Sequence, residues 1–462
     1  MRSICLLALA GLALASCLPA LAPASANGSP ASWSAPATLS PCAAVGGARA
    51  VFPRDKPTHG TGRGAVVWSA ARSCLQGAGT LIAQIGAGDV PGKPSYALAH
   101  GGAKLALRPP LAVAPAPHGQ LAIAGSGGAH GGGALVQGQA AGPFSPLGGL
   151  AGALDAPASL FTAYLGDIAL ATPIAGGLDD NGLELRIERH FAHSLSPTIT
   201  VKGAAGGGAI ESPTVSLDFR TDAIVVWRQA DALWARDLPA SGRAQPTQRL
   251  ATAAHAPRVT ALISDDNRAM VAWADEQHGH TSIYLDYSAS GVRFGKPLLL
   301  ERFANPGGIA YPAKSPLLVR LSSESVMLAW TGAQDGHWVV RTAAIDLNGL
   351  RKASTVSPPG SDALLDDLQP GPNGEAIALW GEPQRDADGS GALDLATQAL
   401  VAARGIDASP GITIFGGPEQ VAPPGPNSEA TLAFDPDSDR ALALWRGADG
   451  AIDYAIRTPA TH

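Results

Sequence analysis

Met270-Val271-Ala272-Trp273 is a short apolar run that ends in tryptophan, and runs of this kind organise the whole chain of 462 residues. Six copies end in tryptophan, and the last five follow one another at spacings of 46 to 65 residues. The other five are Ala65-Val66-Val67-Trp68, Ile224-Val225-Val226-Trp227, Met327-Leu328-Ala329-Trp330, Ile377-Ala378-Leu379-Trp380 and Leu442-Ala443-Leu444-Trp445. An internal period of this length is typical of repeat proteins, in which every copy is one supersecondary unit.

Two further copies lack the tryptophan. Trp68 and Trp227 are 159 residues apart, which is three times 53. Leu121-Ala122-Ile123-Ala124 and Ile168-Ala169-Leu170-Ala171 lie inside this gap and match the run except at its last residue. The chain therefore predicts eight repeats, with seven as the alternative if one of these two copies is not a repeat.

Each repeat contains four strand candidates. An apolar run of four to five residues between turn residues is typical of a buried strand. In the repeat of Trp273, the other three candidates are Val259–Ile263, Ser282–Tyr287 and Phe294–Leu299. Glycine, proline and asparagine interrupt the chain too often for helices. Four antiparallel strands per repeat make a propeller blade, so the sequence predicts an all-β protein, a β-propeller of about eight four-stranded blades.

The two ends of the chain complement each other. Only one strand candidate, Ala451–Arg457, follows Trp445, so the last blade is one strand short. Near the N-terminus, Trp33–Leu39 matches the fourth-strand pattern of other repeats, such as Phe144–Leu147. An N-terminal strand that completes the last blade closes the ring and leaves no exposed sheet edge. We therefore expect Trp33–Leu39 to pair with Ala451–Arg457.

The six tryptophans themselves are expected to be structural. A large ring at the end of the second strand of a repeat gains most burial between adjacent blades. We expect these side chains to pack there rather than to bind a ligand.

The pattern resembles that of secreted bacterial β-propeller repeat proteins, from about Trp33 to Arg457. None of the repeats carries the full signature of WD40 repeats, of kelch repeats or of the Ser-x-Asp-x-Gly-x-Thr-Trp box of sialidases. The resemblance implies the fold and leaves the function open, because function depends on sites rather than on the fold.

The first 26 residues predict an export signal. Met1-Arg2-Ser3 is a basic start, Ile4–Leu18 carries no charge, and Ala24-Ser25-Ala26 offers the small residues that a signal peptidase recognises. A bacterial lipoprotein signal is the alternative, because Leu14-Ala15-Ser16-Cys17 looks like a lipobox in which Cys17 is lipidated. In either case we expect residues 27–462 to form one propeller domain that is secreted or periplasmic, with a lipid anchor in the second case.

The charge balance argues against one class of partner. The net charge is −6, and acidic and basic residues are interspersed, so no basic stripe is present to neutralise phosphates. Nucleic-acid binding is therefore not expected. No later segment predicts a membrane span, since glycine and proline interrupt the long uncharged stretch 109–154. We expect a monomer.

Two of the four cysteines, Cys5 and Cys17, lie in the export segment. Cys42 and Cys74 remain, and an even pair in an oxidising compartment predicts one disulfide. Cys74 lies in a link between second and third strands and Cys42 in a link between blades. Both kinds of link emerge on the same face of a propeller.

The segment from Asp386 to Asp394 is the best candidate metal site. Asp386, Asp388 and Ser390 place oxygen donors at alternate positions, Gly389 permits a sharp turn, and Asp394 closes the loop. Such donors suit a hard cation such as calcium. The loop resembles the calcium loops of integrin-type propellers, where the pattern is Asp-x-Asp-x-Asp-Gly-x-x-Asp and Ser390 replaces the third aspartate. An acidic turn that binds no metal is the alternative, and no other cofactor is expected.

A second polar loop, Asp275-Glu276-Gln277-His278-Gly279-His280, follows Trp273. Two histidines and two carboxylates, Asp275, Glu276, His278 and His280, suit zinc binding or acid–base catalysis. A solvated loop without either role is the alternative. The chain contains neither His-Glu-x-x-His nor Gly-x-Ser-x-Gly, so no catalytic residue is assigned from a motif.

Two functional hypotheses follow. The first is a non-catalytic binding or scaffold propeller outside the cytoplasm, with an unknown protein or glycan partner, because the repeats carry no catalytic signature. The second is a secreted hydrolase or lyase that acts on glycans, with its site on the face that bears the Asp275–His280 and Asp386–Asp394 loops. Turnover of a glycan separates the two.

Overall fold

The computed structural model is nearly all-β. It describes residues 31–41, 43–53, 64–71, 74, 78–86, 90–116, 119–126, 133–149, 159–162, 167–174, 182–188, 199–203, 208, 210–240, 245–252, 258–288, 293–312, 314–347, 349–371, 374–386, 392–409, 412–435 and 438–459. The predicted export signal, Cys17 included, lies outside these residues. Two short 3₁₀ turns, Pro306–Gly308 and Ala448–Gly450, are the helical elements of the described part. No helix there is long and apolar enough to cross a membrane.

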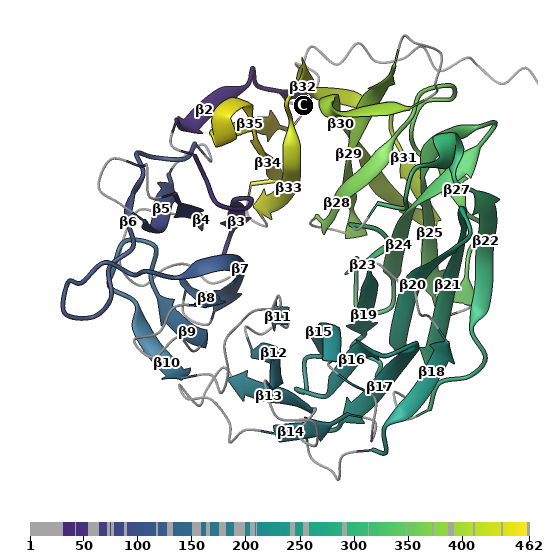
Figure 1. Cartoon of the computed structure of the whole chain (residues 1–462), viewed down its shortest axis with the longest axis horizontal. Coiled ribbons are helices and arrows are strands. Elements are labelled where there is room, and N and C mark those ends of the chain that lie inside the picture. Colours follow the sequence, from purple (N-terminus) through teal and green to yellow (C-terminus); the bar gives the residue numbers. More distant parts are fainter. Residues whose placement is uncertain are drawn as a thin grey trace, which may run out of the picture.

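The described strands form eight sheets, each of four or five antiparallel strands. In Figure 1 the sheets lie in a ring, with one strand of each sheet next to the centre. The fold is an eight-bladed β-propeller, as the repeat pattern predicts, and the alternative of seven blades is wrong. The blades are numbered 1 to 8 in chain order, and the two copies without tryptophan form blades 2 and 3.

The strands take the same four positions in every blade. The innermost strands of blades 1 to 8 are β3 (Arg49–Val51), β7 (Arg108–Ala116), β11 (Ser159–Thr162), β15 (Ile210–Leu217), β19 (Val259–Ile263), β23 (Leu317–Arg320), β28 (Leu364–Pro370) and β33 (Ser428–Asp435). The second strands are β4 (Gly64–Ala70), β8 (Gln120–Ser126), β12 (Ile168–Ile174), β16 (Ala223–Gln229), β20 (Ala269–Gln277), β24 (Val326–Gln334), β29 (Ala376–Arg385) and β34 (Arg440–Arg446). The third strands are β5 (Gly79–Ile85), β9 (Gly133–Gly138), β13 (Gly182–Glu188), β17 (Ala232–Leu238), β21 (His280–Ser288), β25 (His337–Asp346), β30 (Leu393–Ser409) and β35 (Ile452–Thr458).

The outer strands vary more. They are β6 (Ser95–Tyr96), β10 (Ser145–Gly149), β14 (Ile199–Lys202), β18 (Gln248–Thr252), β22 (Leu298–Ala304), β26 (Gly349–Leu350) with β27 (Ser354–Thr355), β31 (Ile412–Phe415) with β32 (Glu419–Gly425), and β1 (Ser32–Trp33) with β2 (Ala37–Ser40). In blades 6, 7 and 8 the outer position is divided between two short strands that pair with the same third strand.

The alternation of strand direction gives the ring two distinct faces. The innermost strands begin at one face, here called the entry face, and end at the other, the exit face. The turns between second and third strands and the links between blades lie on the entry face. The turns between first and second strands lie on the exit face. Each face therefore collects the same type of loop from every blade.

The N-terminal strands complete the last blade, which confirms the predicted closure. Trp33 of β1 is paired with Arg457 of β35, and Ala37 of β2 is paired with Tyr454 of the same strand. Figure 1 shows β2, in purple, beside β35, in yellow. The first and last parts of the described chain thus share one sheet, and β35 has no free edge at these positions.

The hydrophobic core lies between the blades. Val66 and Trp68 of β4 pack in one cluster with Leu444 of blade 8, whereas Val67 packs in another with Leu121 of blade 2. Successive side chains of a strand point to opposite faces of the sheet, so each second strand contributes to two interfaces. Eight apolar clusters of this kind lie between the eight pairs of adjacent blades.

The tryptophans that end the apolar runs belong to these clusters, as predicted. At most 2% of each residue is exposed; they are Trp68, Trp227, Trp273, Trp330, Trp380 and Trp445. Their position on the second strand places each ring between two sheets, where it removes the most apolar surface from water.

One strand prediction is displaced. The outer strand of blade 5 was expected at Phe294–Leu299, but β22 spans Leu298–Ala304. Phe294 instead packs in the cluster between blades 4 and 5, and its backbone N–H donates to Gln248 Oε1 at 3.2 Å. Pro297 has no N–H for a ladder, so the pairing begins after it.

The predicted disulfide cannot be followed to both of its ends, because Cys42 lies outside the described residues. Cys74 is buried, and its Sγ lies 3.8 Å from the carbonyl oxygen of Ala43, the residue after Cys42. Ala71 N–H donates to the same oxygen at 3.0 Å. The two segments are thus neighbours on the entry face, and the pairing of Cys42 with Cys74 stays a prediction.

We predict that deletion of residues 31–40 lowers the melting temperature by several degrees and makes the protein self-associate. The deletion removes β1 and β2, so the edge of β35 becomes available to another chain. Calorimetry and light scattering measure the two effects, and a variant that lacks only residues 27–30 is the control. A deletion variant that stays monomeric with an unchanged melting temperature contradicts the role of β1 and β2 in closure.

Candidate functional site

The predicted calcium loop joins β29 to β30 on the entry face, and its tip (387–391, including Asp388 and Ser390) lies outside the described residues. The two ends of the loop are close together, because Asp386 N–H donates to Ala392 O at 2.9 Å. The Asp394 carboxylate accepts the Ala396 N–H at 2.9 Å. The structure thus brings the ends of the loop together and does not test its affinity for calcium.

The second predicted loop is the tight turn between β20 and β21. The carboxylate of Glu276 accepts hydrogen bonds from Asn305 Nδ2 at 2.8 Å and from Tyr311 N–H at 3.0 Å, so it holds the link to blade 6. Asp275 is buried and accepts a bond from Gln277 Nε2 at 2.9 Å. His278 and His280 are exposed at the tip of the turn, where His280 Nδ1 lies 3.2 Å from His278 O. Within the described residues, no three His, Cys, Asp or Glu side chains are grouped so as to hold a metal ion.

A groove of about 320 Å³ lies on the entry face between blades 6 and 7. Its walls are formed by the turn between β24 and β25, the link from blade 6 to blade 7, and the end of β29. The lining residues are His337, Gly360, Ser361, Asp362, Glu382, Pro383, Gln384, Arg385, Ala399 and Pro424. The groove adjoins the start of the predicted calcium loop, since Arg385 precedes Asp386.

The turn between β24 and β25 fixes the position of His337. Gln334 and His337 are cross-strand partners, so only Asp335 and Gly336 form the turn. Both have positive φ, 51° and 79°, as the favoured two-residue turns of a β-hairpin require. His337 is therefore the first residue of a buried strand, and its side chain is 29% exposed at the groove.

Asp362 is the centre of the polar contacts in the groove. Its side chain is 3% exposed and accepts the Trp338 N–H at 2.9 Å. Arg385 donates Nε to Oδ2 at 2.6 Å and Nη2 to Oδ1 at 3.0 Å, a bidentate ion pair. His337 Nδ1 lies 3.3 Å from Oδ2. Asp362 thus joins a turn of blade 6 to the end of a strand of blade 7.

The hydrogen bonds of Arg385 determine the tautomer of His337. Arg385 Nη2 also lies 3.3 Å from His337 Nδ1, and a guanidinium can only donate. However, both hydrogens of Nη2 have shorter bonds, to Gly336 O at 2.6 Å and to Asp362 Oδ1 at 3.0 Å. His337 Nδ1 therefore carries the proton and donates it to Asp362, which leaves a lone pair on Nε2.

Asp362 stays ionised in this arrangement. Burial alone would raise the pKa of its carboxyl, but the hydrogen bonds and charge of Arg385, with the donors of Trp338 and His337, lower that pKa below its usual value. The bond to Asp362 likewise raises the pKa of Arg385. The carboxylate can therefore orient the imidazole of His337.

A second carboxylate lines the same groove. Glu382 is half-buried, and its Oε1 accepts a hydrogen bond from Trp380 Nε1 at 2.9 Å. The tryptophan that packs between blades thus also positions a groove residue. An oriented imidazole and a second titratable group on one groove are the elements of acid–base catalysis.

The sequence carries one signal for His337, the glycine before it. Gly336-His337 occupies the same hairpin position as Gly279-His280, one blade earlier, because His337 pairs with Gln334 as His280 pairs with Gln277. The two differ in their surroundings. Among the residues that the structure describes, no carboxylate contacts His280 Nδ1, whereas His337 faces Asp362. Nothing in the sequence around Asp362 indicates this contact, since it depends on the path of the link between blades.

Comparisons with known proteins concern the fold. No family model matches the chain, and no curated protein matches it in sequence. An ulvan lyase from a new family of polysaccharide lyases is 12% identical over 92% of this chain and 97% of that chain, with a TM-score of 0.46. A prolyl endopeptidase is 12% identical, with a TM-score of 0.42. The match covers 87% of this chain and 55% of the length of the endopeptidase. An α-L-arabinanase from Penicillium chrysogenum is 8% identical over 65% of this chain and 92% of that chain, with a TM-score of 0.35.

The likeness is one of fold. Polysaccharide lyases and glycosidases are among these structural neighbours. A function for this chain has to be argued from its own residues.

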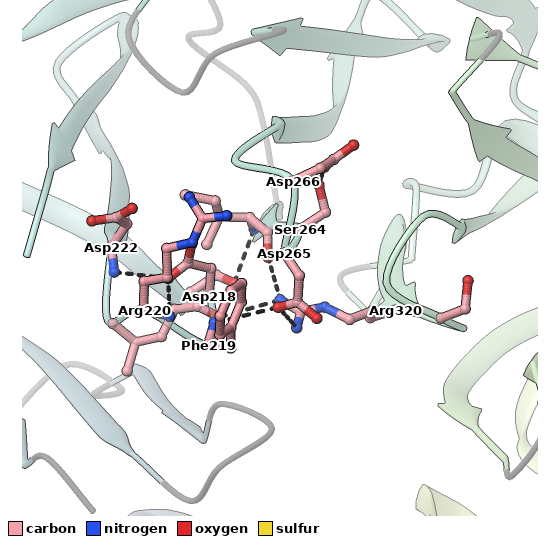
Figure 2. A network of polar contacts seen from close by, with 12 residues as sticks. Asp218, Phe219, Arg220, Asp222, Ser264, Asp265, Asp266 and Arg320 are labelled. Carbon is pink, nitrogen blue, oxygen red and sulfur yellow. Dashed lines mark hydrogen bonds and ion pairs between the residues drawn. The ribbon is translucent and has the colours of Figure 1, made fainter.

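The exit face carries a different network, which joins three blades (Figure 2). Arg320, the last residue of β23, donates Nη1 to Asp265 Oδ1 at 2.5 Å and Nη2 to the backbone oxygens of Ile263 and Leu217. Phe219 N–H donates to the same Asp265 oxygen at 3.3 Å. Arg320 thus ties the exit-face ends of the innermost strands of blades 4, 5 and 6, which is a structural role.

Next to this network, blade 4 holds three carboxylates close together. Asp218 accepts the backbone N–H groups of Arg220 and Asp222 at 2.8 and 2.9 Å, and Asp222 accepts that of Ala240 at 2.7 Å. Asp237 is 3% exposed. Asp218 Oδ2 and Asp237 Oδ1 are buried without a hydrogen-bond partner among the described residues.

The carboxyl group of Asp237 therefore stays protonated up to a higher pH than an ordinary aspartate does. Burial, together with the charges of Asp222 and Asp218, raises the pKa of Asp237 to about 7. Burial also raises the pKa of Asp286, at the corresponding end of the third strand in blade 5, to about 6. The folded state then binds more protons than the unfolded state between about pH 4 and 7, so stability falls as pH rises through this window.

We predict that Asp237→Asn removes part of the loss of stability that accompanies a rise in pH. The amide is neutral at every pH, so the variant should match the wild type near pH 4.5 and be more stable at pH 8, by on the order of 2–4 kcal/mol. Denaturant unfolding at both pH values measures the difference. The control is Asp335→Asn, at an exposed turn position, which should follow the wild type throughout. A stability difference for Asp237→Asn that does not change with pH contradicts the assignment.

Proposed function

We propose that this protein is an exported propeller that acts on a glycan as a hydrolase or lyase, with its site in the groove between blades 6 and 7. The observation that carries the proposal is the contact between His337 Nδ1 and Asp362, at 3.3 Å, on the wall of a groove that also presents Glu382. This contact leaves Nε2 of His337 as a proton acceptor. The predicted N-terminal signal supports export, and the location agrees with the face expected from the sequence.

His337 would act as the general base. In a lyase reaction, Nε2 takes the proton from the carbon next to a carboxyl group. The electron pair forms a carbon–carbon double bond, and the glycosidic oxygen leaves from the next carbon and takes up a proton. In a hydrolysis, Nε2 takes a proton from water, which attacks the anomeric carbon as the glycosidic oxygen leaves. Glu382 is the group on the same groove that can supply the proton to the leaving oxygen, and Asp362 stabilises the imidazolium in both cases.

The proposal predicts that His337→Ala lowers turnover of a glycan substrate by about 100-fold or more, since general acid–base groups contribute that much. The substrate is first found with a panel of neutral and acidic polysaccharides, with new reducing ends as the measure of cleavage and new double bonds as the sign of a lyase. His280→Ala is the matched control, because His280 occupies the same hairpin position one blade away and has no carboxylate partner in the described part of the chain.

Two results contradict the proposal. One is a His337→Ala variant with the turnover of the wild type. The other is a wild type that binds polysaccharides from the panel and cleaves none of them, which favours the non-catalytic binding propeller with a glycan partner.

Calcium binding by the loop of Asp386, Asp388, Ser390 and Asp394 is part of the same proposal, because this loop starts beside Arg385 of the groove. Three carboxylates in a short loop repel one another unless a cation neutralises them. A cation that binds the folded state stabilises it by mass action.

We predict that millimolar calcium raises the melting temperature by a few degrees and that Asp388→Ala abolishes this increment. Differential scanning calorimetry with calcium or with chelator measures it. Asp335→Asn, at the turn of the neighbouring hairpin, is the control. Identical melting curves of the wild type with calcium and with chelator contradict calcium binding.

A further inference from the structure

The apolar packing between blades 5 and 6 continues onto the exit face. Leu285 of β21 and Ile345 of β25 are buried in one cluster, and Leu350, the cross-strand partner of Ile345, packs against it. Leu347 lies between Ile345 and Leu350 in the chain, in the turn from β25 to β26, and is 61% exposed. Blade 6 thus presents an apolar side chain beside the exit-face end of this interface.

Blade 5 presents two more apolar side chains at the same end of the interface. Leu298, at the start of β22, is the cross-strand partner of Leu285. Tyr287, near the end of β21, is the partner of Met270. Cross-strand partners share one face of a sheet, and both Leu285 and Met270 belong to the cluster toward blade 6. Leu298 and Tyr287 nevertheless are 43% and 52% exposed. Tyr287, Leu298 and Leu347 are together called the exit-face strip.

The segments that carry the exit-face strip are basic. Residues 287–300 and 347–361 contain no aspartate or glutamate and four arginines or lysines. One of these, Arg351, donates Nε to the buried Asp346 at 2.8 Å. The other three, Arg293, Lys296 and Lys352, are exposed and form no ion pair with any residue that the structure describes. Positive charge therefore accompanies the exposed apolar side chains.

We propose that the exit-face strip docks the protein on the surface of an anionic lipid membrane. Anionic headgroups attract lysine and arginine, and tyrosine is enriched at the boundary between membrane and water. Apolar side chains beside them gain burial where headgroups meet acyl chains. An acidic glycan would pair with the cations but would leave the leucines in water. The charge and the apolar surface together therefore favour a lipid surface.

The exit-face strip is separate from the proposed active site. None of its residues lines the groove of His337, which lies on the entry face. A protein docked through the exit face keeps this groove turned toward the solvent. The proposal does not depend on the proposed activity.

The test measures how much of the mature protein, residues 27–462, sediments with vesicles of equimolar phosphatidylglycerol and phosphatidylcholine. Vesicles of phosphatidylcholine alone are the reference. We expect binding to the anionic vesicles that weakens as salt rises, because salt screens the charges. Leu347→Ser should weaken this binding about tenfold, through the lost burial of a leucine. Lys352→Gln should weaken it about fivefold, through the loss of one cation near the charged surface.

Ile414→Ser is the matched control. Ile414 and its cross-strand partner Ile406 are also exposed at the exit face, on blade 7. However, Arg404, two residues before Ile406, is paired with Glu375 and Asp439. The control thus removes an exposed apolar side chain of the same face away from the exit-face strip, and it should bind the vesicles as the wild type does.

The proposal is supported if Leu347→Ser and Lys352→Gln lose binding while they keep the melting temperature of the wild type, as substitutions at exposed positions should. It is overturned if the wild type does not bind anionic vesicles, or if both variants bind them as tightly as the wild type. Equal losses of binding in Ile414→Ser and Leu347→Ser also overturn it. Heparin tests the other partner: a wild type that binds this soluble polyanion and no vesicles assigns the basic segments to an acidic glycan instead.

Discussion

The packing of one sheet against the next is the interaction on which the rest of this structure depends. No blade has a hydrophobic core of its own, because a single sheet cannot bury either of its faces without a neighbour. Val66 and Trp68 face blade 8 while Val67 faces blade 2, and the second strand of every blade repeats this division. The ring must therefore close, since an open array would leave two apolar sheet faces in water. The pairing of Trp33 with Arg457 provides the closing contact.

Closure of the ring in turn determines which polar side chains near its centre can bond to one another. Strand ends from different blades converge at both faces of the ring, and charged groups join them. Arg320 ties three blades at the exit face, and Lys314 ties three at the entry face. Bonds of this kind connect strand ends of different blades. They fix how the blades align with one another across an otherwise apolar interface.

The comparison of blades 5 and 6 shows how one hairpin can serve two purposes. His280 and His337 start equivalent third strands, and each follows a glycine turn. In blade 5 the adjoining link presents Asn305, which bonds to Thr281 and Glu276. Within the described ranges, His280 bonds only inside its own turn. In blade 6 the link presents Asp362, which orients His337 and pairs with Arg385. A propeller can thus acquire a site by changes in its links, because the strands hold the hairpins in place regardless.

The sequence by itself determined the repeat, the number of blades and the closing strand. These features depend on local patterns: apolar runs at a regular spacing, turn residues between them, and one strand missing at the end. It also located both polar loops on the correct face. Only the tertiary structure decided which side chains meet, because Asp362 reaches His337 across a link, and Arg320 reaches Asp265 and Leu217 in two other blades. Such contacts depend on the radius of the ring and the path of the links between blades, and no short-range pattern in the chain records either.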